Sequence, residues 1–230
     1  MKEQSEELFE KEIKNELQLE RMILFSDAVF AIVITLMAIE LRIPESEHNL
    51  SSEEWGHIIK HLFSVFAAYL VSFSFIGMLW YRHLKIFSLL NDYDGGLVFR
   101  NMLLLFFIGL FPFGASVVTT PSESMYRFVA YAVIILLCIS SQYALQYYIL
   151  IQRPELRNNQ PVEKQLLSLK ISRVVLIALT LSFIFVAVTY NWLNNENKPL
   201  AFLWFVLFVI TVRIARKKYR PQAAQVTSKA

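Results

Sequence analysis

Residues 21–40, RMILFSDAVFAIVITLMAIE, decide how this chain folds. The stretch carries charges at Arg21, Asp27 and Glu40, and the hydroxyl of Thr35 interrupts its apolar middle. Only 12 residues, 28–39, are uncharged between the two acids, which is short of the ~20 that a lipid-surrounded helix needs. Charged groups cost about 2.5–3.5 kcal/mol on membrane-insertion scales, so they usually face a bundle interior or water. The stretch therefore predicts a membrane helix that lies inside an assembly.

The rest of the chain is equally apolar. Hydrophobic residues make up 56% of the sequence and charged residues 18%, which does not suit a solvated globular surface. Four further uncharged runs, 62–81, 101–122, 128–152 and 174–195, are long enough to cross a bilayer as helices. A shorter run, 199–212, completes the set. The sequence predicts an all-α membrane protein with six transmembrane helices per subunit, at about 21–42, 56–82, 96–120, 124–151, 168–193 and 199–217.

The flanking segments set the expected topology. Residues 1–20 are charged and helix-prone and predict a cytoplasmic amphipathic arm, whereas residues 219–230 predict a disordered cytoplasmic tail. With the N-terminus inside, 18 of the 22 lysines and arginines fall on the cytoplasmic side. This distribution follows the positive-inside rule and predicts a multi-pass protein of the cell membrane with both termini cytoplasmic. Because topology accounts for the cations, a nucleic-acid partner is not expected.

One face of the first helix is a candidate pore lining. Ala28, Ile32, Thr35 and Ile39 recur at spacings of four, three and four, with Leu36 on the flank. Such a stripe is compatible with ordinary core packing. It also suits a pore in a symmetric oligomer, where apolar rings gate by dewetting and a ring of hydroxyls replaces part of an ion's hydration.

Polar residues at the inner ends of three helices form a second candidate group. Asp27 and Arg21 are six residues apart, too far around a helix to pair directly. Trp80, His83 and Asn101 are candidate partners at matching depth, and a carboxylate accepts from indole, imidazole and amide N–H groups alike. Two interpretations stay open, a structural clamp on the first helix and a proton-sensing or proton-relay site.

Catalytic and metal chemistry find no support in the sequence. No Walker loop, dinucleotide fingerprint or Ser/His/Asp motif is present, so we expect no enzyme and no cofactor. The single cysteine, Cys138, lies in the middle of an apolar run, so neither an intrachain disulfide nor a metal site is expected. The chain has six glycines in 230 residues and no TVGYG-like segment. A selectivity filter built from backbone carbonyls is therefore not expected.

The sequence resembles the transmembrane-protein-175 type of potassium channels, which are endolysosomal in animals and lie in the plasma membrane of prokaryotes. The first-span motif is matched by Arg21, Phe25, Ser26 and Asp27 and by the AVFAIVITLMAIEL that follows. The Trp-x-x-His of the second span is matched by Trp80 and His83. The third span of the family has an Asn and a Leu-Phe-Pro-Phe segment, matched by Asn101 and residues 110–113.

The resemblance implies a homotetramer of single six-span repeats with the first helix around a central pore. It implies a constriction at Ile32 with Leu36 and Ile39 further out, and a selectivity-linked hydroxyl at Thr35. It also implies a packing network around the pore helix, made of Arg21, Phe25, Ser26, Asp27, Trp80, His83 and Asn101. We therefore expect a potassium-selective leak channel that passes potassium transiently, with other monovalent cations as further candidates. The alternative is a proton-coupled or proton-conducting transporter that uses Asp27, Glu40 and His83.

Overall fold

The computed structural model describes residues 2–40, 52–119, 125–193, 206, 208–215 and 217. These residues form helices joined by turns, with one isolated antiparallel bridge between Leu90 and Arg157. The elements are α1 (Lys2–Leu36), the 3₁₀ turn η1 (Met37–Glu40), α2 (Ser52–Phe87), α3 (Gly95–Gly109), α4 (Phe111–Thr119), α5 (Met125–Tyr147), the π-helical η2 (Tyr148–Gln152), the 3₁₀ turn η3 (Pro154–Leu156) and α6 (Glu163–Trp192).

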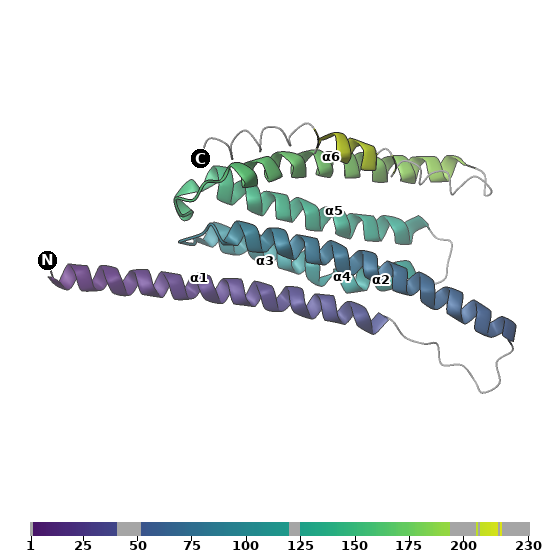
Figure 1. Ribbon diagram of the computed structural model, residues 1–230, viewed down its shortest axis with the longest axis horizontal. Coiled ribbons are helices and arrows are strands. Elements are labelled where there is room, and N and C mark those ends of the chain that lie inside the picture. The colour runs from purple at the N-terminus through teal and green to yellow at the C-terminus, as the bar shows by residue number, and fades with distance from the viewer. Residues whose placement is uncertain are drawn as a thin grey trace.

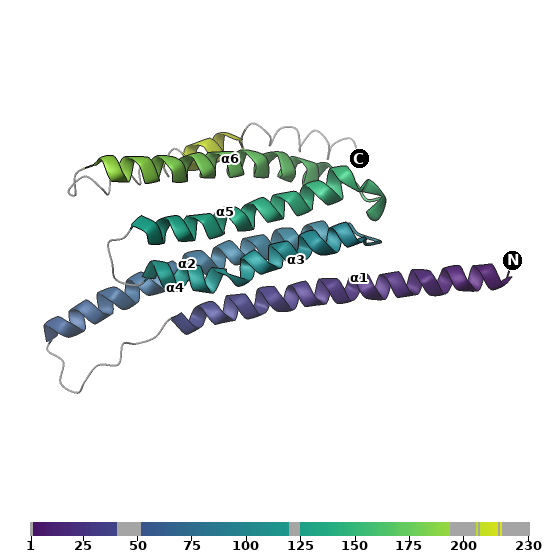
Figure 2. The same ribbon diagram turned by 180° about the vertical axis from the view of Figure 1, so that it is seen from behind.

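The long helices lie roughly alongside one another in layers (Figure 1). α5 contacts α6 on one side and α3 and α4 on the other, and α1 packs against α2 and α3 at the edge of the bundle. The start of α1, the α2–α3 connection and the α5–α6 connection lie at the same end of the molecule, as both views show (Figures 1 and 2). In the part of the chain that the structure describes, α1 packs on one side only, against α2 and α3.

Within the described residues, five helical stretches are long and apolar enough to cross a membrane, which fits the predicted all-α membrane class. They are Ile13–Ile39, Val65–Phe87, Gly95–Val117, Met125–Gln152 and Glu163–Tyr190. Of the sixth predicted span, 199–217, residues 206, 208–215 and 217 are helical and residues 199–205 lie outside the described part. The predicted tail, 219–230, lies outside it as well.

Two local features add detail to the expected organisation. The arm and the first span are one uninterrupted helix, because residues 2–36 contain neither proline nor glycine. The third span is divided instead: α3 ends at Gly109 and α4 begins at Phe111. Pro112 has no N–H to donate to the carbonyl of Ile108, so the helical hydrogen-bond ladder is interrupted there.

The core is aliphatic and aromatic and lies between α1, α2, α3 and α5. Its fully buried members include Phe30, Ile76, Leu97, Ile108 and Leu145. The close approach of α4 to α5 depends on Gly114, where a Cβ atom would come 2.7 Å from Cδ1 of Ile134. A larger residue at position 114 would therefore force the Ile134 side chain to move.

Candidate functional site

The first helix has two opposite faces. Phe30, Val33 and Met37 are at most 4% exposed and pack into the core of the subunit. Ile32, Leu36 and Ile39 are 56%, 43% and 49% exposed, and Ala28 and Thr35 are exposed beside them. All five residues of the predicted stripe therefore share the face that points away from the core of the chain.

Thr35 places a hydroxyl on this face. Its Oγ1 donates a hydrogen bond to the carbonyl of Ile32 at 2.8 Å, the usual way for a threonine to satisfy its proton inside a helix. The proton is thereby turned toward the backbone, and the oxygen presents lone pairs outward. An outward hydroxyl oxygen is an acceptor, which suits a cation better than an anion.

A buried polar cluster joins α1 to α2 and α3. Ser26 is fully buried, and its Oγ donates to the carbonyl of Met22 at 2.8 Å. Nδ2 of Asn101 lies 2.9 Å from Ser26 Oγ, and Oδ1 of Asn101 lies 2.9 Å from Nε2 of His83. The single proton of Ser26 already goes to Met22, so Ser26 must accept from the Asn101 amide. The amide oxygen then faces His83, which must carry its proton on Nε2.

Aromatic rings enclose the histidine of this cluster. The ring of His83 stacks on Phe87 with centroids 3.9 Å apart, and Phe30 of α1 lies at 5.5 Å. His83 is only 1% exposed. The imidazole therefore acts in packing as well as in hydrogen bonding, and it ties α2 to both neighbouring helices.

The remaining predicted residues divide into two groups. Oδ1 of Asp27 accepts from Nε1 of Trp80 at 2.9 Å, which adds a second link between α1 and α2 near the surface of the bundle. Arg21 and Phe25 lie on exposed positions of α1, outside both the Ser26 cluster and the Asp27–Trp80 pair. The side chain of Glu40, the third member of the suggested relay, lies outside the described part of the structure.

The partners differ from the expected pattern in one respect. His83 and Asn101 were expected as candidate partners of Asp27 or Arg21, whereas they bond to each other and, through Asn101, to Ser26. The serine next to the carboxylate is the centre of the buried cluster. A serine in the first span is a weak sequence signal, since its usual bond is to its own helix backbone.

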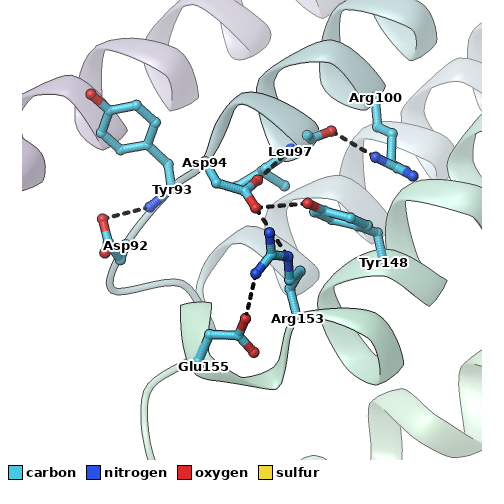
Figure 3. A network of polar contacts seen from close by, with 9 residues as sticks. Asp92, Tyr93, Asp94, Leu97, Arg100, Tyr148, Arg153 and Glu155 are labelled. Atoms are coloured by element: carbon cyan, nitrogen blue, oxygen red, sulfur yellow. Dashed lines mark hydrogen bonds and ion pairs between the residues drawn. The ribbon is translucent and has the colours of Figure 1, made fainter.

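Sequence reasoning missed a second polar network, at the start of α3 (Figure 3). Oδ1 of Asp94 caps α3 by accepting from the N–H of Leu97 at 2.7 Å. Its Oδ2 accepts from Tyr148 Oη at 2.7 Å and lies 3.3 Å from Nε of Arg153. The Asp-Gly-Gly sequence before an apolar run was the available signal for the cap. Nothing local pointed to Tyr148 and Arg153, which are more than 50 residues away in the chain.

The network lowers the pKa of Asp94 below its ordinary value. Partial burial acts to raise this pKa, but the hydrogen bonds from Tyr148 and from the Leu97 N–H outweigh it. The nearby charges of Arg153 and Arg100 act in the same direction. Asp94 is therefore held as a carboxylate that connects α3 to the end of α5.

Tyr148 opens the π-helical turn, whose backbone bond runs from the N–H of Arg153 to the carbonyl of Tyr148 at 2.9 Å. The guanidinium of Arg100 lies 3.9 Å from the centroid of the Tyr148 ring and donates to the carbonyl of Gly96 at 3.1 Å. A Cβ atom on Gly96 would lie 2.8 Å from Cζ of Tyr148, so the tyrosine requires glycine there. Nearby, the N–H of Asn158 donates a hydrogen bond to the carbonyl of Leu89 at 2.7 Å, which links the α5–α6 connection to the α2–α3 connection.

Fold and site together define a multi-pass helical membrane protein whose first helix exposes a stripe of apolar side chains and one hydroxyl. The sequence pattern of the family described as "Endosomal/lysosomal potassium channel TMEM175" matches residues 21–112, a segment that contains the C-terminal part of α1, all of α2 and α3, and every residue of the Ser26 cluster. In this segment the chain is similar to the TMEM175 family, and its similarity to bacterial potassium channels points to the prokaryotic members.

Named relatives agree with this assignment. A potassium channel of Chryseobacterium sp. is 34% identical over 92 residues, which are 40% of this chain and 44% of that protein. A potassium channel of Streptomyces collinus is 36% identical over 88 residues, 38% of this chain and 41% of that protein. The matches thus span less than half the length of these relatives.

A solved structure extends the likeness to most of the fold. The crystal structure of a lysosomal potassium-selective channel TMEM175 homolog from Chamaesiphon minutus superposes with a TM-score of 0.57 and 25% identity. The superposition covers 87% of this chain and 99% of that one. The sequence similarity is therefore strongest in the first three spans, whereas the structural similarity extends to the later spans as well.

Proposed function

We propose that this chain is a subunit of a homotetrameric, potassium-selective, leak-type cation channel with a hydrophobic constriction formed by α1. The observation that carries the proposal is the exposed stripe of Ile32, Thr35, Leu36 and Ile39, on the side of α1 opposite its packed face. The names of the bacterial relatives and of the solved homolog support potassium as the permeant ion.

The chemistry of the stripe suits this role. Four isoleucine side chains around an axis make an aperture without hydrogen-bonding groups, which water leaves easily and which an ion crosses only when the ring widens. One turn away, four Thr35 oxygens offer acceptors to a partly dehydrated cation. Because the hydroxyl proton goes to the Ile32 carbonyl, each threonine presents its oxygen rather than its hydrogen.

The Ser26 cluster and the Asp27–Trp80 bond serve as the clamp in this proposal. They fix how α1 is rotated against α2 and α3, and the rotation decides which side chains reach the axis. A proton relay through Asp27 and His83 is less well supported, because the Nε2 proton of His83 is held by Asn101 and the ring is buried.

Potassium flux through purified protein in liposomes tests the proposal. We expect steady, non-saturating flux with single-channel steps, and a reversal potential that favours potassium over sodium under bi-ionic conditions. Ile32→Asn should raise the conductance and weaken selectivity by wetting the ring. Ile177→Asn is the matched control, since Ile177 of α6 is 53% exposed but lies outside the stripe. Slow, saturable uptake would instead indicate a carrier, and equal effects of both substitutions would refute the assigned face.

A further inference from the structure

The part of α1 that precedes Arg21 carries an apolar stripe on a highly charged background. This segment projects beyond the other helices at that end of the molecule (Figures 1 and 2). Phe9, Ile13 and Leu17 recur every four residues and are 63%, 42% and 54% exposed. Apolar side chains aligned and exposed in this way mark an interaction surface, which we call the arm stripe.

The rotation of the segment is fixed by its own subunit. Leu19 is 6% exposed and belongs to the subunit core, and Nδ2 of Asn15 lies 3.4 Å from Oδ1 of Asp92 in the α2–α3 connection. Each helical residue advances by about 100°, so Leu17 points about 160° away from Leu19 and from Asn15. The arm stripe therefore cannot turn inward without removing Leu19 from the core.

The arm stripe continues into the exposed face of the membrane part of α1. Leu17, Leu24 and Ala31 recur every seven residues and are all exposed, and Ala28 and Thr35 run beside them. A seven-residue repeat is the period with which parallel helices stay in contact along their length. One side of α1 thus carries a single contact face from the charged segment before Arg21 into the uncharged stretch 28–39.

A second copy of this chain is the occupant that fits. A membrane surface fits poorly, because helices that lie on anionic lipid are rich in lysine and arginine, whereas residues 2–20 contain seven glutamates and three lysines. We propose that the arm stripes of neighbouring subunits contact one another and extend the assembly as a helical bundle beyond the membrane. The inference rests on the proposed function, since the α1 helices must surround one axis.

Disulfide cross-linking of the full chain in membranes tests this contact. Cys138 is the only cysteine, so Cys138→Ala gives a background for single cysteines at Ile13, Leu17 and Leu24. Gln4→Cys is the control, because Gln4 is also exposed and lies about half a turn around the helix from Ile13. After mild oxidation we expect Ile13→Cys, Leu17→Cys and Leu24→Cys to give several-fold more of a species at twice the subunit mass of 26.8 kDa than Gln4→Cys gives.

The outcomes separate this inference from the proposed function. If Leu24→Cys pairs but Ile13→Cys and Leu17→Cys pair no better than the control, the arm contact is refuted and the central α1 bundle stands. If none of the three pairs, both are refuted. If Leu17→Cys stays unpaired and vesicles of anionic lipid shield it from a water-soluble maleimide, the arm lies on the membrane and the contact between copies is refuted.

Discussion

Replacing Asn101 by leucine should destabilise the subunit through the histidine rather than through the serine. Leucine has a similar volume but offers neither the Nδ2 donor to Ser26 nor the Oδ1 acceptor to His83. Ser26 keeps its bond to the Met22 carbonyl and loses only an accepted bond. The Nε2 proton of His83 loses its acceptor while the ring stays 1% exposed.

The size of the effect follows from these two losses. An orphaned buried polar group costs about 1–3 kcal/mol in soluble proteins. Hydrogen bonds between membrane helices are weaker on average, about 0.6 kcal/mol and at most about 1.7, because the unfolded chain in the membrane also finds partners. With one proton fully orphaned and one accepted bond lost, we expect Asn101→Leu to lower the free energy of unfolding by about 1–3 kcal/mol.

Reversible denaturation in mixed detergent micelles, followed by tryptophan fluorescence at one fixed protein concentration, measures this loss. Adding His83→Phe should recover part of it, since phenylalanine keeps the stacking on Phe87 and removes the orphaned proton. Thr180→Val is the control, because its hydroxyl bonds within its own helix, and it should change stability by less than about 0.5 kcal/mol. Additive effects of Asn101→Leu and His83→Phe, or a neutral Asn101→Leu, would refute the clamp.

Three further perturbations test other parts of the molecule. Gly114→Ala should leave the protein less stable than Gly109→Ala does, because the added Cβ at position 114 displaces the terminal methyl of Ile134 and presses on the Tyr131 ring, whereas no atom lies within 4 Å of a Cβ at position 109; equal melting temperatures would contradict this. Because the pKa of Asp94 is lowered in the folded state, its contribution to stability is present above the ordinary aspartate range and is lost as pH falls through the folded-state pKa. Between about pH 5 and pH 3 the melting temperature of the wild type should therefore fall more than that of Asp94→Asn. Thr35→Ala should reduce the preference for potassium over sodium, and an unmoved bi-ionic reversal potential would exclude the hydroxyl from selection.

The helical class and the approximate positions of most spans followed from the sequence because length and hydropathy are sufficient to identify a membrane helix. Which face of the first helix is exposed could also be inferred, since Phe30, Val33 and Met37 alternate with Ile32, Leu36 and Ile39 at helical spacing. The division of the third span at Leu110 was indicated only indirectly, by Pro112.

The polar contacts were harder to predict because they depend on distances between chain segments. The depth of Trp80 and Asn101 could be judged from their places in the apolar runs, but the choice of Ser26 over Asp27 as the partner of Asn101 depends on helix rotation. The Asp94 network contains Tyr148 and Arg153, which a π-helical backbone bond joins, and no hydrophobic pattern distinguishes a π turn from an α turn.

The unbroken length of α1 has a mechanical consequence. A helix of 35 residues is a stiff rod about 52 Å long, and this one has no flexible joint between Leu17 and Thr35. A binding protein or a change in local charge that twists or tilts the helix at Leu17 therefore also moves Thr35, which lies about 27 Å further along the helix axis. A contact made at the projecting end of α1 can thus be transmitted along the helix to the exposed stripe around Thr35.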